Sequence, residues 1–155
     1  MNWKVALLIV GGVVLLPVAG LALLSAFSRR PSNLGVVDGR LAPCPDSPNC
    51  VSTFAQDAAH RMEPIPHTGP AQDAMAQIKA IVASRPRTKI VTENDTYLHV
   101  EFTSALFRFV DDVEFLIDET KGKIHFRSAS RAGYGDLGAN RRRMQDFVDA
   151  FTQRH

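Results

Sequence analysis

The sequence has 155 residues, of which 45% are hydrophobic and 22% are charged, and its formal net charge is +2. This length predicts one domain with a modest core, and this composition excludes a disordered chain. Lys4, Arg29 and Arg30 are the only charged residues among the first thirty, and removing them from the 18 Lys and Arg residues leaves 15 basic against 16 acidic side chains. A remainder so balanced argues against nucleic-acid binding.

Residues 5–27 form an apolar segment of 23 residues without a charge. A helix of that length, at about 1.5 Å per residue, spans the roughly 30 Å hydrocarbon layer of a bilayer. Trp3 stands at one end of it, where an interfacial anchor is common. We therefore expect a membrane anchor over residues 1–30, a linker over 31–40 and a single domain over 41–155.

Small residues and flanking charges bear on the cleavage and the orientation of this segment. Residues 26–28 offer small residues at the spacing of a signal-peptide cleavage site, although a cleavable apolar region has only about 7–15 residues. Positive charge is nearly balanced, with Lys4 and the terminal amine on one side of the segment and Arg29 and Arg30 on the other. Because an anchor followed by one domain usually exports that domain, we expect a single-pass signal anchor with the domain in the periplasm or at the cell exterior.

The two cysteines of the chain, Cys44 and Cys50, bracket five residues in a loop with three prolines. Closely spaced prolines exclude a helix there. A disulfide is the favoured interpretation, since an exported domain tolerates one. Two free buried thiols, a redox pair and a zinc site are the alternatives, although a redox pair usually has C-x-x-C spacing and zinc needs two further ligands.

Two helices are expected in the domain. The first carries an apolar stripe at helical spacing, with Pro70 at its first position and Pro86 just after its end. The second begins near Asn140, whose side chain is a good N-cap. The loop before it, residues 131–138, has three glycines but matches no phosphate-binding pattern. The two apolar stripes consist of Ala71, Met75, Ile78 and Val82, and of Met144, Phe147, Val148 and Phe151.

Alternating apolar and polar residues predict strands over 89–92, 97–103, 109–117 and 124–130. In the third of them, Phe109, Val113, Phe115 and Ile117 share one face, and Asp112 and Glu114 the other. We expect an α+β fold, in which an antiparallel sheet of about four strands has two helices packed on its apolar side.

Pairing Ile117 with Ile124 across the polar connection fixes the register of the last hairpin. A slip by one residue would place carboxylates on the apolar face. Arg131 then lies diagonal to Asp112, so we expect a small ion network. The other cross-strand pairs are Phe115 with Phe126, Glu114 with Arg127, and Asp112 with Ala129.

Several separated motifs agree in order with those of one known family. They are Leu34-Gly35, Cys44-Pro45, residues 48–52, residues 109–115, residues 127–131, Gly133-Tyr134, residues 136–138, Asn140-Arg141 and Arg143. On these motifs the chain resembles the domain-of-unknown-function family numbered 1499 over roughly residues 34–154. The resemblance implies an envelope or plastid-type protein that often has an N-terminal membrane segment. It implies no established reaction, substrate or cofactor.

A set of polar residues in the second half of the domain is the candidate ligand-binding site. As a structural set, its arginines brace carboxylates; as a binding site, they receive an anionic ligand, with help from the helix N-terminus. Asp111 and Ser128 lie among them. The candidate residues are Asp112, Glu114, Arg127, Ser130, Arg131, Asp136, Asn140, Arg141 and Arg143.

The rival hypothesis is a small envelope enzyme that uses Asp112 and Glu114 as acid and base or as ligands of a hard metal. The five histidines show no metal-ligand spacing and no serine lies in a G-x-S-x-G elbow, so we expect neither a metal site nor a cofactor. We favour a binding or structural module of the cell envelope, whose partners are the bilayer through residues 5–27 and either an anionic ligand or an envelope protein.

Overall fold

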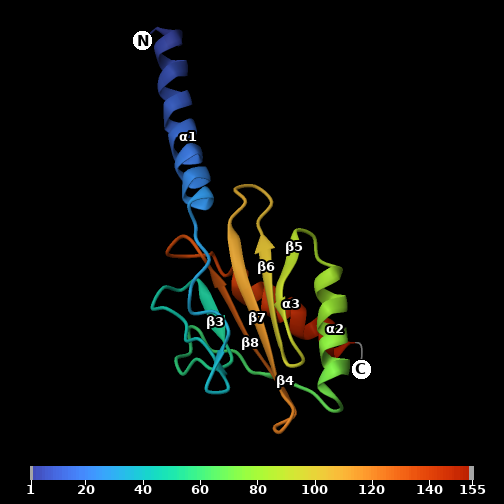
Figure 1. Ribbon diagram of the computed structural model, residues 1–155. Coiled ribbons are helices and arrows are strands. Elements are labelled where there is room, and N and C mark those ends of the chain that lie inside the picture. Colours follow the sequence, from blue (N-terminus) through green and yellow to red (C-terminus); the bar gives the residue numbers. More distant parts are fainter. Residues whose placement is uncertain (1, 154–155) are drawn as a thin grey trace.

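The computed structural model describes residues 2–153, except for the side chains of residues 4–10, 14 and 26. Helix α1, Trp3–Ala26, extends away from the domain formed by the rest of the chain (Figure 1). Within the described residues, no helix reaches the length and apolarity of a membrane span. The predicted anchor, residues 5–27, includes several residues whose side chains are not described.

The domain is built on an antiparallel sheet of six strands, beside which lies a separate two-stranded ribbon (Figure 1). The strand order is β3-β8-β7-β6-β5, and β4 also pairs with β8. The ribbon is β1, Val36–Val37, with β2, Arg40–Leu41. The other elements are β3 Cys50–Ser52, β4 Ile65–Pro66, α2 Ala71–Ala83, β5 Thr88–Glu93, β6 Tyr97–Thr103, β7 Val110–Asp118, β8 Lys123–Ser130 and α3 Ala139–Thr152.

This architecture confirms the α+β class, the antiparallel sheet and its two packing helices. The expected number of strands was too low, because two short segments, β3 and β4, add to the outer side of β8. With three and two residues, these strands are too short to show an alternating pattern. Only their pairing with β8 makes them part of the sheet.

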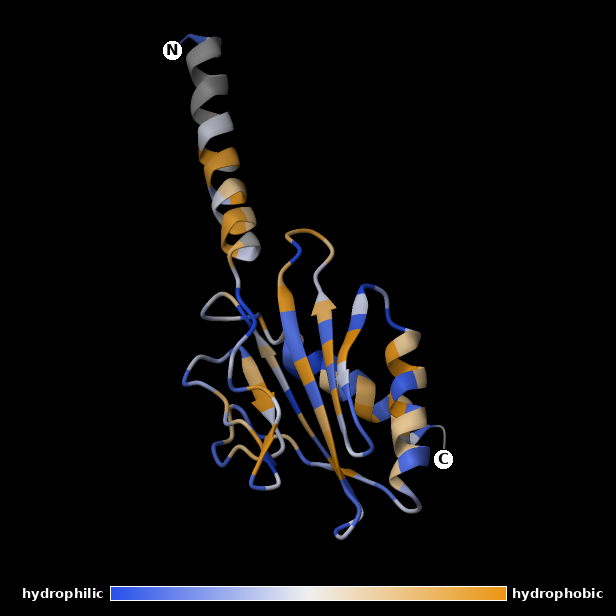
Figure 2. Cartoon of the chain, in the orientation of Figure 1, coloured by the Kyte–Doolittle hydropathy of each residue, from blue (hydrophilic) through white to orange (hydrophobic). Residues whose placement is uncertain are grey.

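Helices α2 and α3 cover one face of the sheet, and the main core lies between them and the strands. Figure 2 shows the alternation of apolar and polar residues along the central strands. Phe115 of β7 contacts Phe147 of α3 with ring centroids 4.6 Å apart. Ile78 and Phe126 are fully buried in the same core. Each such side chain stabilises the fold by about 1.5–3 kcal/mol through burial.

The predicted register of the last hairpin is confirmed. Ile117 lies opposite Ile124, and Glu114 lies opposite Arg127. One apolar assignment was wrong, since Phe109 precedes β7 instead of joining its core face. The loop of residues 104–109 closes on itself, with Ser104 N donating to Phe109 O at 2.8 Å and Phe109 N donating to Ser104 Oγ at 2.9 Å.

The predicted N-cap of the last helix was also wrong. The capping position of α3 is Gly138, with a φ of 78°, and Asn140 lies within the first turn. Asp136 supplies the missing acceptor, since its carboxylate accepts the N–H of Gly138 at 2.9 Å and that of Asn140 at 2.7 Å. The glycine thus turns the chain, and an aspartate two residues earlier satisfies the free N–H groups of the helix start.

The face of the sheet opposite the helices is covered by residues 30–43, which we call the covering segment. Its Leu41 packs with Tyr97 and Leu116 in a second, smaller core. The predicted disulfide between Cys44 and Cys50 is confirmed, and it joins the end of the covering segment to β3. The polar side of the sheet is therefore buried under the chain.

Candidate anion-binding site

The nine predicted site residues are divided between the two faces of the sheet. Because successive side chains of a strand point to opposite faces, Asp112, Glu114 and Arg127 lie under the covering segment, whereas Ser130 lies on the helix face. Arg131 follows β8 and returns to the covered face. Asp136, Asn140 and Arg143 belong to the helix face, where the loop of residues 131–138 leads into α3.

Asp112 is the centre of the first network, on the covered face. Arg131 binds its carboxylate with two hydrogen bonds of 2.6 and 2.8 Å, and His99 Nε2 donates to it at 2.7 Å. Arg131 also donates to Glu101 at 2.6 Å, and Arg30 donates to Glu101 at 2.5 Å. Burial by itself raises the pKa of Asp112, but the bonds from Arg131 and His99 outweigh it and hold that pKa below its ordinary value.

Glu114 is fully buried next to this network. It accepts hydrogen bonds from Tyr97 Oη and from Gly35 N, each at 2.8 Å, and from Arg127 Nη1 at 3.3 Å. Burial, together with the charge of Glu114, raises the pKa of Tyr97. The Nε atom of Arg127 is buried without a hydrogen-bond partner. These contacts fix the covering segment on the sheet.

The predicted acid–base pair is therefore enclosed. The side chain of Asp112 is 1% exposed and that of Glu114 is 0% exposed, and both bind an arginine. The bonds that lower the pKa of Asp112 make it a poor general acid, and a carboxylate without solvent access does not meet a substrate. Among the described residues no three His, Cys, Asp or Glu side chains are grouped to hold a metal ion.

Asn140 is the centre of a second network on the helix face. Its Oδ1 accepts from Ser128 Oγ and from Arg143 Nη1, each at 2.6 Å. Its Nδ2 donates to Asn49 O and to Ser130 Oγ, each at 2.9 Å. A buried amide with all these partners joins the cysteine loop, β8 and the start of α3, which is a structural role.

The other two arginines of the predicted set have different surroundings. Arg143 also pairs with Asp111 at 2.5 Å and lies over the ring of Phe102, 4.9 Å from its centroid. Arg141 extends the other way and donates to the carbonyl oxygens of Arg61 and Ala59. Arg141 thus braces the loop that follows β3 and lies apart from both networks.

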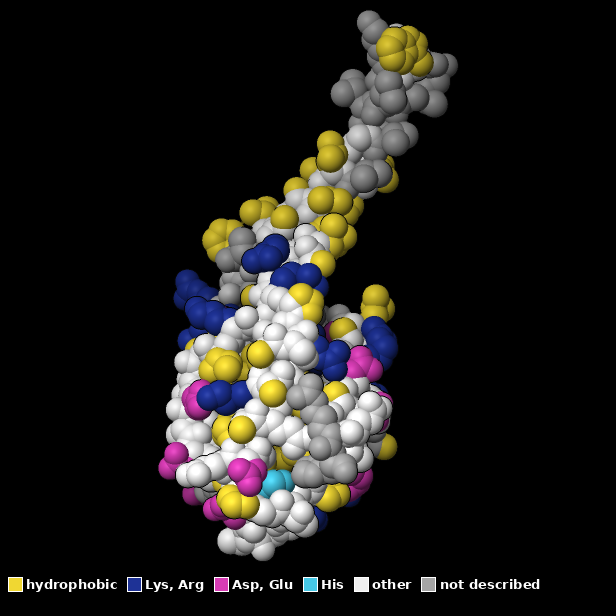
Figure 3. All heavy atoms as spheres, turned by 90° about the vertical axis from the view of Figure 1, so that its right-hand side faces the viewer, with side chains coloured by type: hydrophobic (Ala, Val, Ile, Leu, Met, Phe, Trp, Pro, Cys, Tyr) yellow, Lys and Arg dark blue, Asp and Glu magenta, His cyan; other side chains and the backbone are white. Residues whose placement is uncertain are grey.

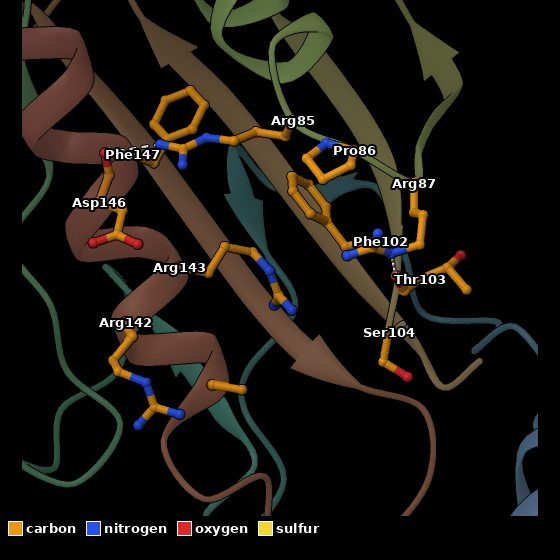
Figure 4. Close-up of a pocket in the computed structure, with 11 residues that line it drawn as sticks. Arg85, Pro86, Arg87, Phe102, Thr103, Ser104, Arg142, Arg143, Asp146 and Phe147 are labelled. Carbon is orange, nitrogen blue, oxygen red and sulfur yellow. Dashed lines mark hydrogen bonds between the residues drawn. The ribbon is translucent and has the colours of Figure 1, made fainter. Parts of the chain in front are cut away.

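A hollow of about 340 Å³ opens beside Arg143, and we call it the basic hollow. The link between α2 and β5, the end of β6 and the first turns of α3 form its walls (Figure 4). Arg142, Arg143 and Asp146 lie on one side and Arg85 and Arg87 on the other. The residues that matter for its charge and polarity are Arg85, Arg87, Ser104, Arg142, Arg143 and Asp146.

Three guanidinium groups of the basic hollow bind only backbone carbonyls. Arg85 donates to Asp146 O at 3.2 Å, Arg87 to Thr103 O at 3.2 Å, and Arg142 to Leu137 O at 2.7 Å. No carboxylate of residues 2–153 lies within salt-bridge distance of these three groups. Each guanidinium has five N–H donors, so most donors remain for an anion such as a phosphate or a carboxylate.

Little in the sequence indicates the basic hollow. Arg143 was among the predicted residues, but Arg85, Arg87 and Arg142 were missed. The run of three arginines at 141–143 was a signal, although helical geometry sends Arg141 to another side. The contact between this run and the Arg85-Pro86-Arg87 segment depends on tertiary packing, which no local pattern shows.

The family described as "Protein of unknown function (DUF1499)" matches residues 40–151 of the chain. This match begins at β2 and covers all six strands of the main sheet, α2, α3 up to Phe151 and every residue of the basic hollow. Comparisons with curated proteins and with solved structures give no match.

Proposed function

We propose that this chain, which belongs to the DUF1499 family, is a binding domain for phosphate or carboxylate groups. We also propose that it is tethered to a membrane of the cell envelope. The basic hollow is the binding site. The two buried networks hold the frame around it.

The observation that carries this proposal is the absence of an acidic partner for Arg85, Arg87 and Arg142 among the described residues. Three arginines of the buried networks, Arg127, Arg131 and Arg143, are paired with carboxylates. Three guanidinium groups without a salt bridge outweigh the single carboxylate of Asp146 in the same lining, so this concave surface has a net positive potential. Phosphate and carboxylate oxygens match the planar donors of arginine.

The proposed tether rests on the apolar run of residues 5–27 and on α1. A helix of 24 residues is about 36 Å long. Its described side chains include large apolar groups that the domain does not cover, among them Leu15 and Leu16. The Cys44–Cys50 disulfide supports a location of the domain in the periplasm or at the cell exterior, since such bonds persist in oxidising compartments.

The test is the affinity of the full chain, in neutral detergent, for inorganic phosphate, measured by calorimetric titration. Each of the changes Arg85→Ala, Arg87→Ala and Arg142→Ala removes a contact of about 0.5–1 kcal/mol, which is a two- to fivefold loss of affinity. The triple variant is expected to bind at least about tenfold more weakly.

Arg141→Ala is the matched control. It removes the same charge from the same helix, but its guanidinium binds Ala59 and Arg61 outside the basic hollow. The expected phosphate affinity of this variant equals that of the wild type. Equal affinity of the wild type and the folded triple variant would overturn the proposed site.

A further inference from the structure

We infer that the end of the domain next to α1 docks onto an anionic lipid surface, so that the basic hollow receives lipid phosphate groups. This inference rests on the proposed function and names the source of the anion. The docking end consists of the basic hollow, the loop of residues 104–109 and the loop of residues 131–138.

The sheet register places these parts at one end of the molecule. Thr103 pairs with Val110 just before and after the first loop, and Asp111 pairs with Ser130 just before the second loop. Both loops therefore lie at the same end of the strands. Arg87 O accepts the N–H of Thr103 at 3.0 Å, so the basic hollow lies at that same end of the strands. Figure 1 shows α1 leaving the domain at this end.

The two loops expose apolar side chains at this end. Leu106 is 79% exposed, Tyr134 is 78% exposed and Leu137 is 94% exposed. Leu137 has a φ of 54°, a left-handed conformation that is uncommon for a leucine. The bonds from Gly138 N and Asn140 N to Asp136 on both sides of it fix this backbone. The backbone of Leu137 is thus strained while its side chain is exposed to water, as expected of a residue that contacts a ligand or a membrane.

The short link between α1 and the domain restricts how far the domain can rotate relative to α1. Helix α1 ends at Ala26, and Arg30 is already bound to Glu101 of β6 at 2.5 Å. The three residues between them, 27–29, reach about 10 Å when extended. If α1 lies in a bilayer, the end of the strands that carries Glu101 and both loops faces the bilayer surface.

The charge at this end is positive. The two carboxylates of Glu101 and Asp112 are neutralised by Arg30 and Arg131 together, and that of Asp111 by Arg143. Figure 3 shows Lys and Arg side chains gathered over the part of the domain next to α1. Apolar side chains on loop tips among arginines are typical of binding to anionic membrane surfaces. In the part of the chain that the structure describes, five arginines of this end lack a carboxylate partner, and Asp136 and Asp146 are its two carboxylates without a basic partner. The excess is therefore positive, and the five arginines are Arg29, Arg85, Arg87, Arg108 and Arg142.

The experiment uses the full chain in lipid nanodiscs, either of phosphatidylcholine alone or of phosphatidylcholine with phosphatidylglycerol. Backbone hydrogen exchange of residues 104–109 and 131–138 is measured by mass spectrometry. We expect exchange in both loops to be about tenfold slower in the anionic discs, because docking excludes water from their amides. The β7–β8 hairpin at residues 118–123 lies at the far end and serves as the internal control.

Two variants separate this inference from the proposed function. Leu106→Ser with Leu137→Ser is expected to abolish the slower exchange but to keep the affinity for inorganic phosphate. Arg85→Ala with Arg87→Ala and Arg142→Ala is expected to lose both. If wild-type loops exchange equally in the two kinds of disc while phosphate still binds, the docking inference is wrong and the proposed function stands. The docking inference is also wrong if the slower hydrogen exchange of the two loops requires an added soluble protein or free phosphate and not anionic lipid.

Discussion

Arg131 shows how single side chains fix the covered face of the sheet. Its guanidinium, 8% exposed, joins Asp112 to Glu101, and Glu101 in turn holds Arg30 of the covering segment. The link between Asp112 and Arg131 follows from the strand register and was predictable. The part played by His99 was not, because an isolated histidine on a strand gives no sign of its partner.

Arg131→Ala is expected to lower the free energy of unfolding by about 3–5 kcal/mol, because it leaves the buried Asp112 with one partner fewer. Denaturant titration of the full chain measures this change. Arg61→Ala is the control, since it breaks an exposed ion pair with Glu63 and is expected to cost less than about 1 kcal/mol. Equal losses for the two variants would contradict a buried structural network.

Stability is also expected to depend on pH through Asp112. Burial raises the pKa of Asp112, but the bonds from Arg131 and His99 lower it by more, so the folded state binds a proton less readily than the unfolded state. The stabilisation is therefore complete above the unfolded pKa of about 3.9 and is lost as pH falls through the folded value. Chemical unfolding from pH 6 down to about pH 2.5 measures this loss.

Asp112→Asn provides the comparison for this pH dependence. The variant has lower stability at neutral pH, and its loss below about pH 4 is expected to be shallower by up to about 1.4 kcal/mol per pH unit, the value for one proton. Parallel curves for the wild type and the variant would show that Asp112 does not carry the acid sensitivity.

The elements of the domain differ in how far local sequence determines them. The β7–β8 hairpin was predicted with its register because Ile117 and Ile124 flank a short polar connection, and only one register keeps Phe115 and Phe126 on the core face. Strands β3 and β4 were not, since their pairing with β8 depends on contacts between segments distant in sequence. The start of α3 was misplaced because Asp136, not Asn140, satisfies its first N–H groups.

The Cys44–Cys50 disulfide acts at the scale of one element, the loop that leads into β3. Replacing both cysteines by serine is expected to lower the free energy of unfolding by about 2 kcal/mol, because the open ring has more freedom in the unfolded state. Denaturant titration measures the change, and reduction of the wild type is the control that should reproduce it. No change in either case would mean that β3 is held by its pairing with β8 alone.

At the scale of the whole molecule, the sequence predicted a domain with a separate apolar segment, and arginines near carboxylates. Folding sorts these arginines into two groups that composition does not distinguish. Arg127, Arg131 and Arg143 neutralise buried or half-buried carboxylates and hold the frame. Arg85, Arg87 and Arg142 come together because the α2–β5 link lies next to α3, and no carboxylate of the described residues forms a salt bridge with them.

The most direct measurement of the central claim is NMR detection of the arginine Nε–Hε groups while inorganic phosphate is added to the full chain. We predict that the signals of Arg85, Arg87 and Arg142 shift together and saturate with one dissociation constant, whereas those of Arg61 and Arg141 stay in place. Shifts of equal size in all five signals, growing without saturation, would contradict the existence of a specific anion site in the basic hollow.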